Sequence, residues 1–355
     1  MMAPPMLRPS PLWVVPLLLA CDDAAPRDDA SAIDSSSDAP VAYTPPTPDF
    51  PDEHDDRPFA LSEVGLFDGD RIAPDLLAYT PNYPLWSDGL AKRRWLRLPA
   101  GATADSTIDT IDTIDTTDPD RWQLPMGAIL FKEFADADRP LETRVIARTG
   151  PGSFDYWMGA FRWRPDGSDA DFVRAGEVDV LGTDHDVPSA ERCWSCHVGT
   201  PGRVLGLTTL QLTATALAEL SPHFSAPLPT PPPLPGSPEA QAALGYLHAN
   251  CAHCHSPTGV ARPDSDIDLS LSVADLTVAD TGTWQTAVAV ATRSWIRPDY
   301  PLRIAPGDPE HSAVIVRMHV RGDADQMPPL ATEHIDEQGL AILSTWIASL
   351  PASGD

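Results

Sequence analysis

The sequence predicts an α+β protein with more than one domain, in which a β-rich N-terminal domain precedes a small α-helical domain. The chain has 355 residues, enough for about two domains. Forty of them are proline, which excludes long helical bundles because proline fixes φ and lacks a backbone donor. Short runs of strand-forming residues come first in the folded part, and two helix-like segments come last.

The β-rich domain is expected over residues 59–225. Its runs of aromatic and β-branched residues are separated by Gly, Pro and Asp, a pattern typical of an antiparallel sheet. The predicted strands cover residues 128–134, 141–147, 154–163 and 177–181.

A proline-rich segment over residues 226–238 is expected to form an extended linker. Residues 239–355 then form the predicted helical domain, which two helices delimit. The first, 239–250, has helical composition, and the second, 335–350, repeats apolar residues at helical spacing.

The start of the chain predicts a lipoprotein signal peptide over residues 1–20. An arginine precedes an apolar run of about half the length that a bilayer span requires. The run ends in Leu18-Leu19-Ala20-Cys21, which resembles a bacterial lipobox, so Cys21 is the expected site of lipidation. The alternative is a signal peptide cut nearby, with Cys21 incidental. Residues 21–58, rich in Asp, Ser, Ala and Pro, are expected to be a disordered tether. The protein is therefore expected to be lipid-anchored on the periplasmic side of a bacterial membrane.

The charge balance excludes one class of partner. The chain has 24 Lys and Arg against 51 Asp and Glu, a formal net charge of −27. A nucleic-acid binder needs a basic face, so no nucleic-acid partner is expected.

Two CxxCH motifs carry the chemistry. They are Cys193-Trp194-Ser195-Cys196-His197 and Cys251-Ala252-His253-Cys254-His255, and both match the attachment signature of c-type haem. On one helical turn, two thiols reach the two vinyl groups of one haem and the following histidine faces the iron. The two CxxC pairs lie too far apart for a zinc ribbon, and the βαβ context of a thioredoxin-like site is absent from the pattern. The motifs predict two covalently attached haem c groups, with His197 and His255 as iron ligands.

For the second haem, the expected sixth ligand is Met327, in a proline-containing segment before the last helix. The order of motif, methionine and closing helix resembles a class I cytochrome c. This resemblance implies attachment at Cys251 and Cys254, a proximal His255 and a distal Met327; Met318, or no sixth ligand, is the alternative. His248 and His253 are expected to be exposed helix residues.

The first haem has no methionine segment after its motif. A motif at the end of a β-rich domain resembles the β-sheet cytochromes c-prime, whose distal side is often open. The candidate distal ligands are Met126, Met158, His185 and His223, and an iron with an open or water-bound site is the alternative.

Over residues 59–350 the chain resembles a family of exported bacterial dihaem c-type cytochromes. The matching stretches are PLWSDGLAKRRWLRLP (84–99), PMGAILFKEF (125–134), RPLETRVIAR (139–148), RCWSCH (192–197), GRVLGLTTLQL (202–212), LHANCAHCH (247–255), APGDPEHSAVIVRM (305–318) and MPPL (327–330). The resemblance implies electron transport and supplies no substrate.

The expected function is single-electron transfer with a redox protein, such as a basic cytochrome or an oxidase, attracted by the acidic surface. The alternative is a haem enzyme, peroxidase-like or acting on small nitrogen or oxygen compounds. In that case the first haem is an open catalytic site, the second relays electrons, and His185, His223 or Asp186 supplies the acid–base group.

Overall fold

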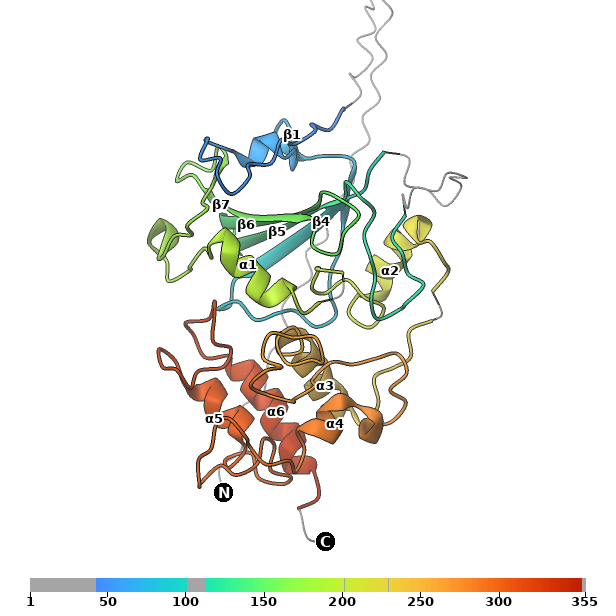
Figure 1. Ribbon diagram of the computed structural model, residues 1–355, viewed down its shortest axis with the longest axis vertical. Coiled ribbons are helices and arrows are strands. Elements are labelled where there is room, and N and C mark those ends of the chain that lie inside the picture. The colour runs from blue at the N-terminus through green and yellow to red at the C-terminus, as the bar shows by residue number, and fades with distance from the viewer. Residues whose placement is uncertain (1–42, 101–112, 201, 229, 353–355) are drawn as a thin grey trace, which may run out of the picture. The chain divides into compact units, whose positions relative to one another are not determined.

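The computed structural model describes residues 43–100, 113–200, 202–228 and 230–352. The predicted signal peptide, Cys21 and the first part of the tether lie outside the described residues. From residue 43 onward the chain forms one compact unit, shown in Figure 1.

A six-stranded sheet dominates this unit. All its strands are antiparallel and follow each other in chain order. They are β3 (Leu76–Ala78), β4 (Ala91–Arg97), β5 (Ile129–Asp136), β6 (Arg139–Arg148), β7 (Tyr156–Trp163) and β8 (Ala170–Phe172), and a separate hairpin pairs β1 (Phe67–Asp68) with β2 (Arg71–Ile72). The first three predicted strands are confirmed as β5, β6 and β7.

The fourth predicted strand, over residues 177–181, is wrong. Glu177 makes only an isolated bridge to Val187, and a short 3-10 helix, η2 (Val180–Gly182), follows. Asp179 and Leu181 have φ angles of 52° and 54°, which an extended strand does not accommodate.

One face of the sheet is covered by the N-terminal segment. Side chains of alternating strand positions pack there on residues from the loop before β1. This core comprises Phe59, Leu61, Val64, Leu66, Trp95, Ile129, Phe131, Val145, Ala147, Phe161, Trp163 and Ala170, with Leu61 in a 3-10 turn, η1 (Leu61–Glu63). Phe50 stacks on Trp157 with ring centroids 4.6 Å apart, so the last part of the predicted tether packs on the sheet.

The opposite face packs on the chain that follows the sheet. Leu96 and Leu130 pack with apolar side chains of residues 114–124 and 204–224, including those of α2 (Ala214–Leu220). A short 3-10 turn, η3 (Ser221–His223), adjoins α2. α1 (Ala190–His197) packs against β7, and Figure 1 shows it on the other side of the sheet from β1.

The C-terminal third has few helices. They are α3 (Pro238–Asn250), α4 (Gly282–Thr286), α5 (Ala313–His319) and α6 (Glu337–Ser349), with a 3-10 turn, η4 (Val278–Asp280). The predicted helices 239–250 and 335–350 are confirmed as α3 and α6. These two pack together, and Gly339 of α6 leaves room for the ring of Tyr246 on α3, since a Cβ there would lie 2.3 Å from the Tyr246 hydroxyl.

The predicted fold class, a β-rich domain followed by a small α-helical cytochrome c domain, is wrong. Residues from 43 onward are one unit built on the sheet, and between α3 and α5 the chain is mostly irregular, with only the short α4 and η4. The proline-rich segment does not act as a free spacer, because Leu234 packs on the core around α3. Leu210, from the part before this segment, is buried in the same core. A Cβ on Gly245 would lie 2.2 Å from the ring of Tyr83, so α3 and the loop before β4 are in direct contact.

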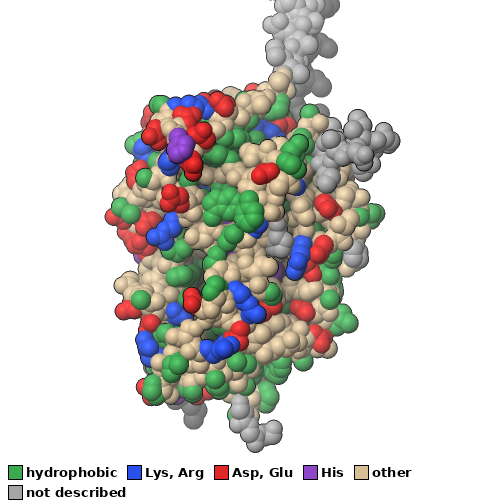
Figure 2. Space-filling view, viewed as in Figure 1, with side chains coloured by type: hydrophobic (Ala, Val, Ile, Leu, Met, Phe, Trp, Pro, Cys, Tyr) green, Lys and Arg blue, Asp and Glu red, His purple; other side chains and the backbone are tan. Residues whose placement is uncertain are grey.

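Acidic and basic side chains are interspersed on the surface. Figure 2 shows carboxylates at many points of the visible face, with Lys and Arg between them. Within the described ranges, no helix combines the length and the apolar character needed to cross a bilayer.

Candidate functional site

The first CxxCH motif occupies the last part of α1, as predicted. The helix presents Cys193 and Cys196 half-buried, and neither forms a disulfide. Burial raises the pKa of Cys193 to about 11, so this thiol is protonated at neutral pH. Trp194, which stands between the two cysteines in the chain, has its ring centroid 6.0 Å from that of Phe154. The guanidinium of Arg203 lies over the ring of Phe154, 4.4 Å from its centroid.

His197 has the hydrogen bonding of a metal-ligating histidine. Its Nδ1 lies 2.7 Å from the carbonyl oxygen of Arg203, so the ring donates its Nδ1 proton there. Burial lowers the pKa of His197 to about 4, which keeps the imidazole neutral. The lone pair is therefore on Nε2, the ring atom that is available as a ligand.

The second motif begins where α3 ends. Asn250, the last residue of the helix, is buried and accepts a hydrogen bond of 2.6 Å from the backbone amide of Trp86. Cys251, Cys254 and His255 follow in a turn closed by a 2.8 Å bond from the amide of His255 to the carbonyl of Cys251. This turn brings the three functional side chains to the same side, although it is not part of a regular helix.

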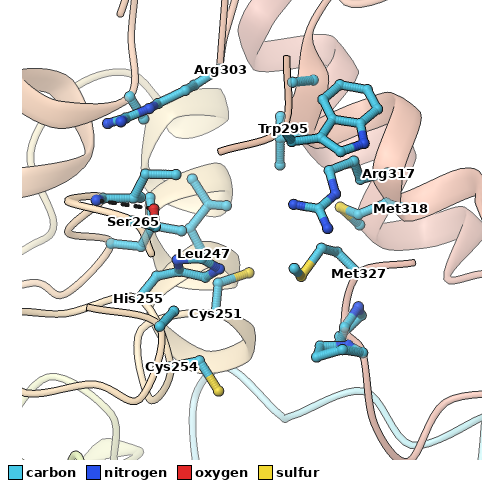
Figure 3. Close-up of a pocket in the computed structure, with 18 of the residues that line it drawn as sticks. Leu247, Cys251, Cys254, His255, Ser265, Trp295, Arg303, Arg317, Met318 and Met327 are labelled. Carbon is cyan, nitrogen blue, oxygen red and sulfur yellow. Dashed lines mark hydrogen bonds between the residues drawn. The ribbon is translucent and has the colours of Figure 1, made fainter. Parts of the chain in front are cut away.

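These side chains face a cavity of about 630 Å³. Cys251, Cys254 and His255 form one wall, and Met318 and Met327 lie on the other (Figure 3). The volume is within the range of cofactor pockets, and such pockets are mainly apolar with a few placed polar groups. The structure thus brings together four predicted residues of the second site, Met327 included.

Two of the motif groups that face this cavity, the thiol of Cys251 and the imidazole of His255, are uncharged. Burial raises the pKa of Cys251 to about 12 and lowers that of His255 to about 4, so the thiol keeps its proton and the imidazole is neutral. The Nδ1 atom of His255 is buried and has no hydrogen-bond partner among the described residues. Two thiols, a neutral imidazole and a thioether around one cavity fit a covalently attached porphyrin with an iron at its centre.

The two motifs, far apart in sequence, meet in space. The thiols of Cys196 and Cys254 lie close enough to influence each other, which lowers the pKa of Cys196 and raises that of Cys254. Thr258 donates a hydrogen bond of 2.6 Å to the carbonyl of Gly199. A Cβ on Gly199 would lie 2.7 Å from Cα of Gly259, so only a glycine permits this approach.

The four candidate distal ligands of the first haem have different surroundings. Met158 is buried in β7, the strand against which α1 packs, and Met126 is 54% exposed. His185 is buried and its Nε2 lies 2.8 Å from Glu142. His223 lies in η3, after α2. Met158 is the one that the fold places both buried and on a strand in contact with the motif helix.

The remaining predicted residues of the second site also differ in their surroundings. Met318 is buried in the core around α3 and also lines the cavity. His248 and His253 are half-buried rather than exposed, and the Nδ1 of His248 accepts a bond of 3.0 Å from the amide of Leu271.

Several residues of these sites were missed from the sequence. Trp295, Arg303 and Arg317 line the second cavity (Figure 3). Trp295 and Arg303 lie in irregular chain, and Arg317 lies in the short helix α5. Arg94 and Lys132 lie on the sheet face near α1. The alternation of residues from Lys92 to Trp95 could have predicted a strand there, with Arg94 on one face of it.

Among the described residues, no group of three or more His, Cys, Asp and Glu side chains is placed to hold a bare metal ion. No family model, curated protein or solved structure matches this chain.

Proposed function

We propose that this chain is a dihaem electron-transfer protein, with one haem bound through thioethers to Cys193 and Cys196 and the other to Cys251 and Cys254. The observation that carries the proposal is the contact between the two motifs. The hydrogen bond from Thr258 to Gly199 and the close approach of Gly199 to Gly259 put the two attachment turns side by side, so electrons can pass within one chain. A haem c, when bound, supplies one iron that takes up or releases a single electron.

The residues of the chain have separate roles in this proposal. His197 and His255 present neutral imidazoles as proximal ligands. Met327 presents its sulfur from the wall opposite His255 (Figure 3). A methionine ligand and an apolar cavity both raise a reduction potential, which makes the second site the stronger electron acceptor.

The cellular setting is part of the same proposal. Cys21 carries the lipid that holds the protein on the periplasmic side of a bacterial membrane. The formal net charge of −27 favours a basic redox partner, such as a cytochrome or an oxidase, because opposite charges raise the rate of encounter.

The test is the mass and redox stoichiometry of the mature protein, made in a host with cytochrome maturation. The denatured wild type should carry the mass of two haems and take up two electrons. The paired variants Cys193→Ala/Cys196→Ala and Cys251→Ala/Cys254→Ala should each retain one haem and take up one electron. The control Cys21→Ser should keep both haems and lose only the lipid. A wild-type mass equal to that of the bare polypeptide with its lipid would overturn the proposal.

A further inference from the structure

Three cations stand side by side on the sheet face near the first motif. Arg94 on β4 pairs in register with Lys132 on β5, which pairs with Arg144 on β6. Residues paired in register point to the same face, so these side chains form a cationic row, defined here as Arg94, Lys132 and Arg144. Like charges directly opposite each other destabilise a sheet.

The cationic row faces the first motif. Arg144 lies close enough to Cys193 and Cys196 for its charge to act on both sulfurs. Lys132 acts in the same way on His197. The row therefore begins at the motif cysteines and continues across the sheet, one strand at a time, to Arg94.

Only one end of the row is neutralised. Arg144 makes a two-point ion pair with Glu142, at 2.6 and 3.0 Å, and the same carboxylate accepts from His185. The guanidinium of Arg94 and the amine of Lys132 have no hydrogen bond and no ion pair with any residue in the described ranges; Lys132 lies over the ring of Phe134, at 4.7 Å. Nearby Lys92 adds charge and donates to the carbonyl of Leu85.

This arrangement is costly for the chain alone. Both side chains are half-buried, so each charge loses part of its hydration, and no partner that the structure describes replaces that part. Burial, followed by the charges of Arg94, Arg144 and Lys92, lowers the pKa of Lys132 well below its ordinary value. Burial also lowers the pKa of Arg94. Two carboxylates placed at Arg94 and Lys132 would offset this cost.

We infer that Arg94 and Lys132 bind the two propionate carboxylates of the first haem. The inference rests on the proposed function. In a porphyrin bound through its vinyl groups, the propionates lie on the edge opposite the thioethers. The cysteines hold one edge near Arg144, and Arg94 lies two strands away, roughly 10 Å at the usual strand spacing. The unpaired cations are thus on the side of the row where the carboxylates must lie.

The test compares Arg94→Gln and Lys132→Met with Arg93→Gln in the haem-loaded full chain. Arg93 is the matched control because it directly precedes Arg94 on β4 and points to the opposite face of the sheet. Its Nε donates a 2.7 Å hydrogen bond to the carboxylate of Glu133. The haem content of each variant is first measured by mass spectrometry. Each variant is then titrated with a reductant at several pH values, and the midpoint potentials are determined. In Arg94→Gln and Lys132→Met, one of the two midpoint potentials should fall while the other stays unchanged, because an unpaired carboxylate favours the more positive, ferric iron. That potential should also become dependent on pH. Arg93→Gln should match the wild type.

The outcomes separate this inference from the proposed function. A chain without haem contradicts the proposed function itself. Two haems with both potentials unchanged in Arg94→Gln and Lys132→Met overturn the propionate assignment. Inorganic phosphate and formate are titrated into the wild-type holoprotein to test for a free anion at the same cations. A saturable change in the haem spectrum that both variants abolish would assign the cations to a free anion and overturn the inference. The lack of such a change supports it.

Discussion

The hydroxyl of Thr258 donates a 2.6 Å hydrogen bond to the carbonyl of Gly199, and this bond joins the segments that follow the two CxxCH motifs. Gly199 stands two residues after His197, and Thr258 three residues after His255. The relative position of the two motifs is therefore fixed by backbone contact rather than by the cysteines alone.

Replacing Gly199 with alanine should push the two motifs apart. The added Cβ would lie 2.7 Å from Cα of Gly259 and 2.9 Å from the carbonyl oxygen of His253, neither of which is a flexible side-chain end. We expect a loss of about 1–3 kcal/mol in the free energy of unfolding. Thr258→Val is the matched variant, since it removes the hydrogen bond without adding bulk between the backbones, and should cost about 1 kcal/mol. Chemical denaturation measures both, and a Gly199→Ala variant as stable as the wild type would show that the motifs do not need this contact.

Replacing Met327 with leucine should change the second site alone. In the proposed dihaem protein this substitution removes the sulfur ligand, so the near-infrared absorption band of methionine-bound ferric haem should disappear and one midpoint potential should fall. Met318→Leu is the control, because Met318 lines the same cavity but is 4% exposed in the core around α3. Loss of the band in Met318→Leu and its retention in Met327→Leu would assign the ligand to Met318.

The sequence was informative where structure depends on local pattern. The strands β5, β6 and β7 and the helices α3 and α6 follow from alternation, helical spacing and turn residues. β4 was not predicted as a strand, because its four cations are unusual in a sheet. Two of these cations are satisfied by distant carboxylates, since Arg93 pairs with Glu133 and Arg97 with Asp75. Such pairs cannot be read from the sequence of one strand.

The two CxxCH motifs were recognised from spacing alone, but their contact in space was not predicted. It depends on Gly199 and Gly259, whose close approach is decided by the packing of the whole unit. The same limit explains the wrong fold class. Proline content predicts an extended linker, but whether that linker packs depends on contacts such as that of Leu234 with the core around α3. These contacts merge the two predicted domains into one unit.

Protonation of His248 should destabilise the fold in acid. Burial lowers the pKa of His248 to about 4 from an ordinary value of 6.5, and its Nδ1 must stay unprotonated to accept from Leu271. Between these two pH values the unfolded chain binds more protons than the folded chain, so stability falls as pH decreases, by at most about 1.4 kcal/mol per pH unit.

The matched variants for this titration are His248→Asn and His311→Asn. Asparagine retains an acceptor near Nδ1 but does not titrate, so His248→Asn should flatten the loss of stability between pH 6.5 and about 4. The Asp308 carboxylate raises the pKa of His311, whose stabilising effect is present at low pH and lost as pH rises. His311→Asn should therefore keep the acid slope. The slope is measured from unfolding curves at several pH values. The haem-loaded protein is used because His197 and His255, when bound to iron, do not titrate in this range. An unchanged slope in His248→Asn would remove His248 as its cause.

The net charge of the chain predicts how salt affects its encounter with the basic redox partner proposed above. A formal net charge of −27 should accelerate collision with a basic soluble cytochrome, and added salt screens this attraction because the Debye length falls to about 8 Å at physiological ionic strength. The second-order rate of electron transfer, measured by stopped flow, should decrease steeply with salt. An acidic cytochrome of similar potential is the control, and its rate should rise with salt because repulsion is screened.

Acidic groups are spread over the visible face rather than gathered in one patch (Figure 2), so single Asp→Asn or Glu→Gln changes there should each have a small effect on the rate. Rates that do not depend on salt for the basic partner would mean that the acidity does not steer electron transfer.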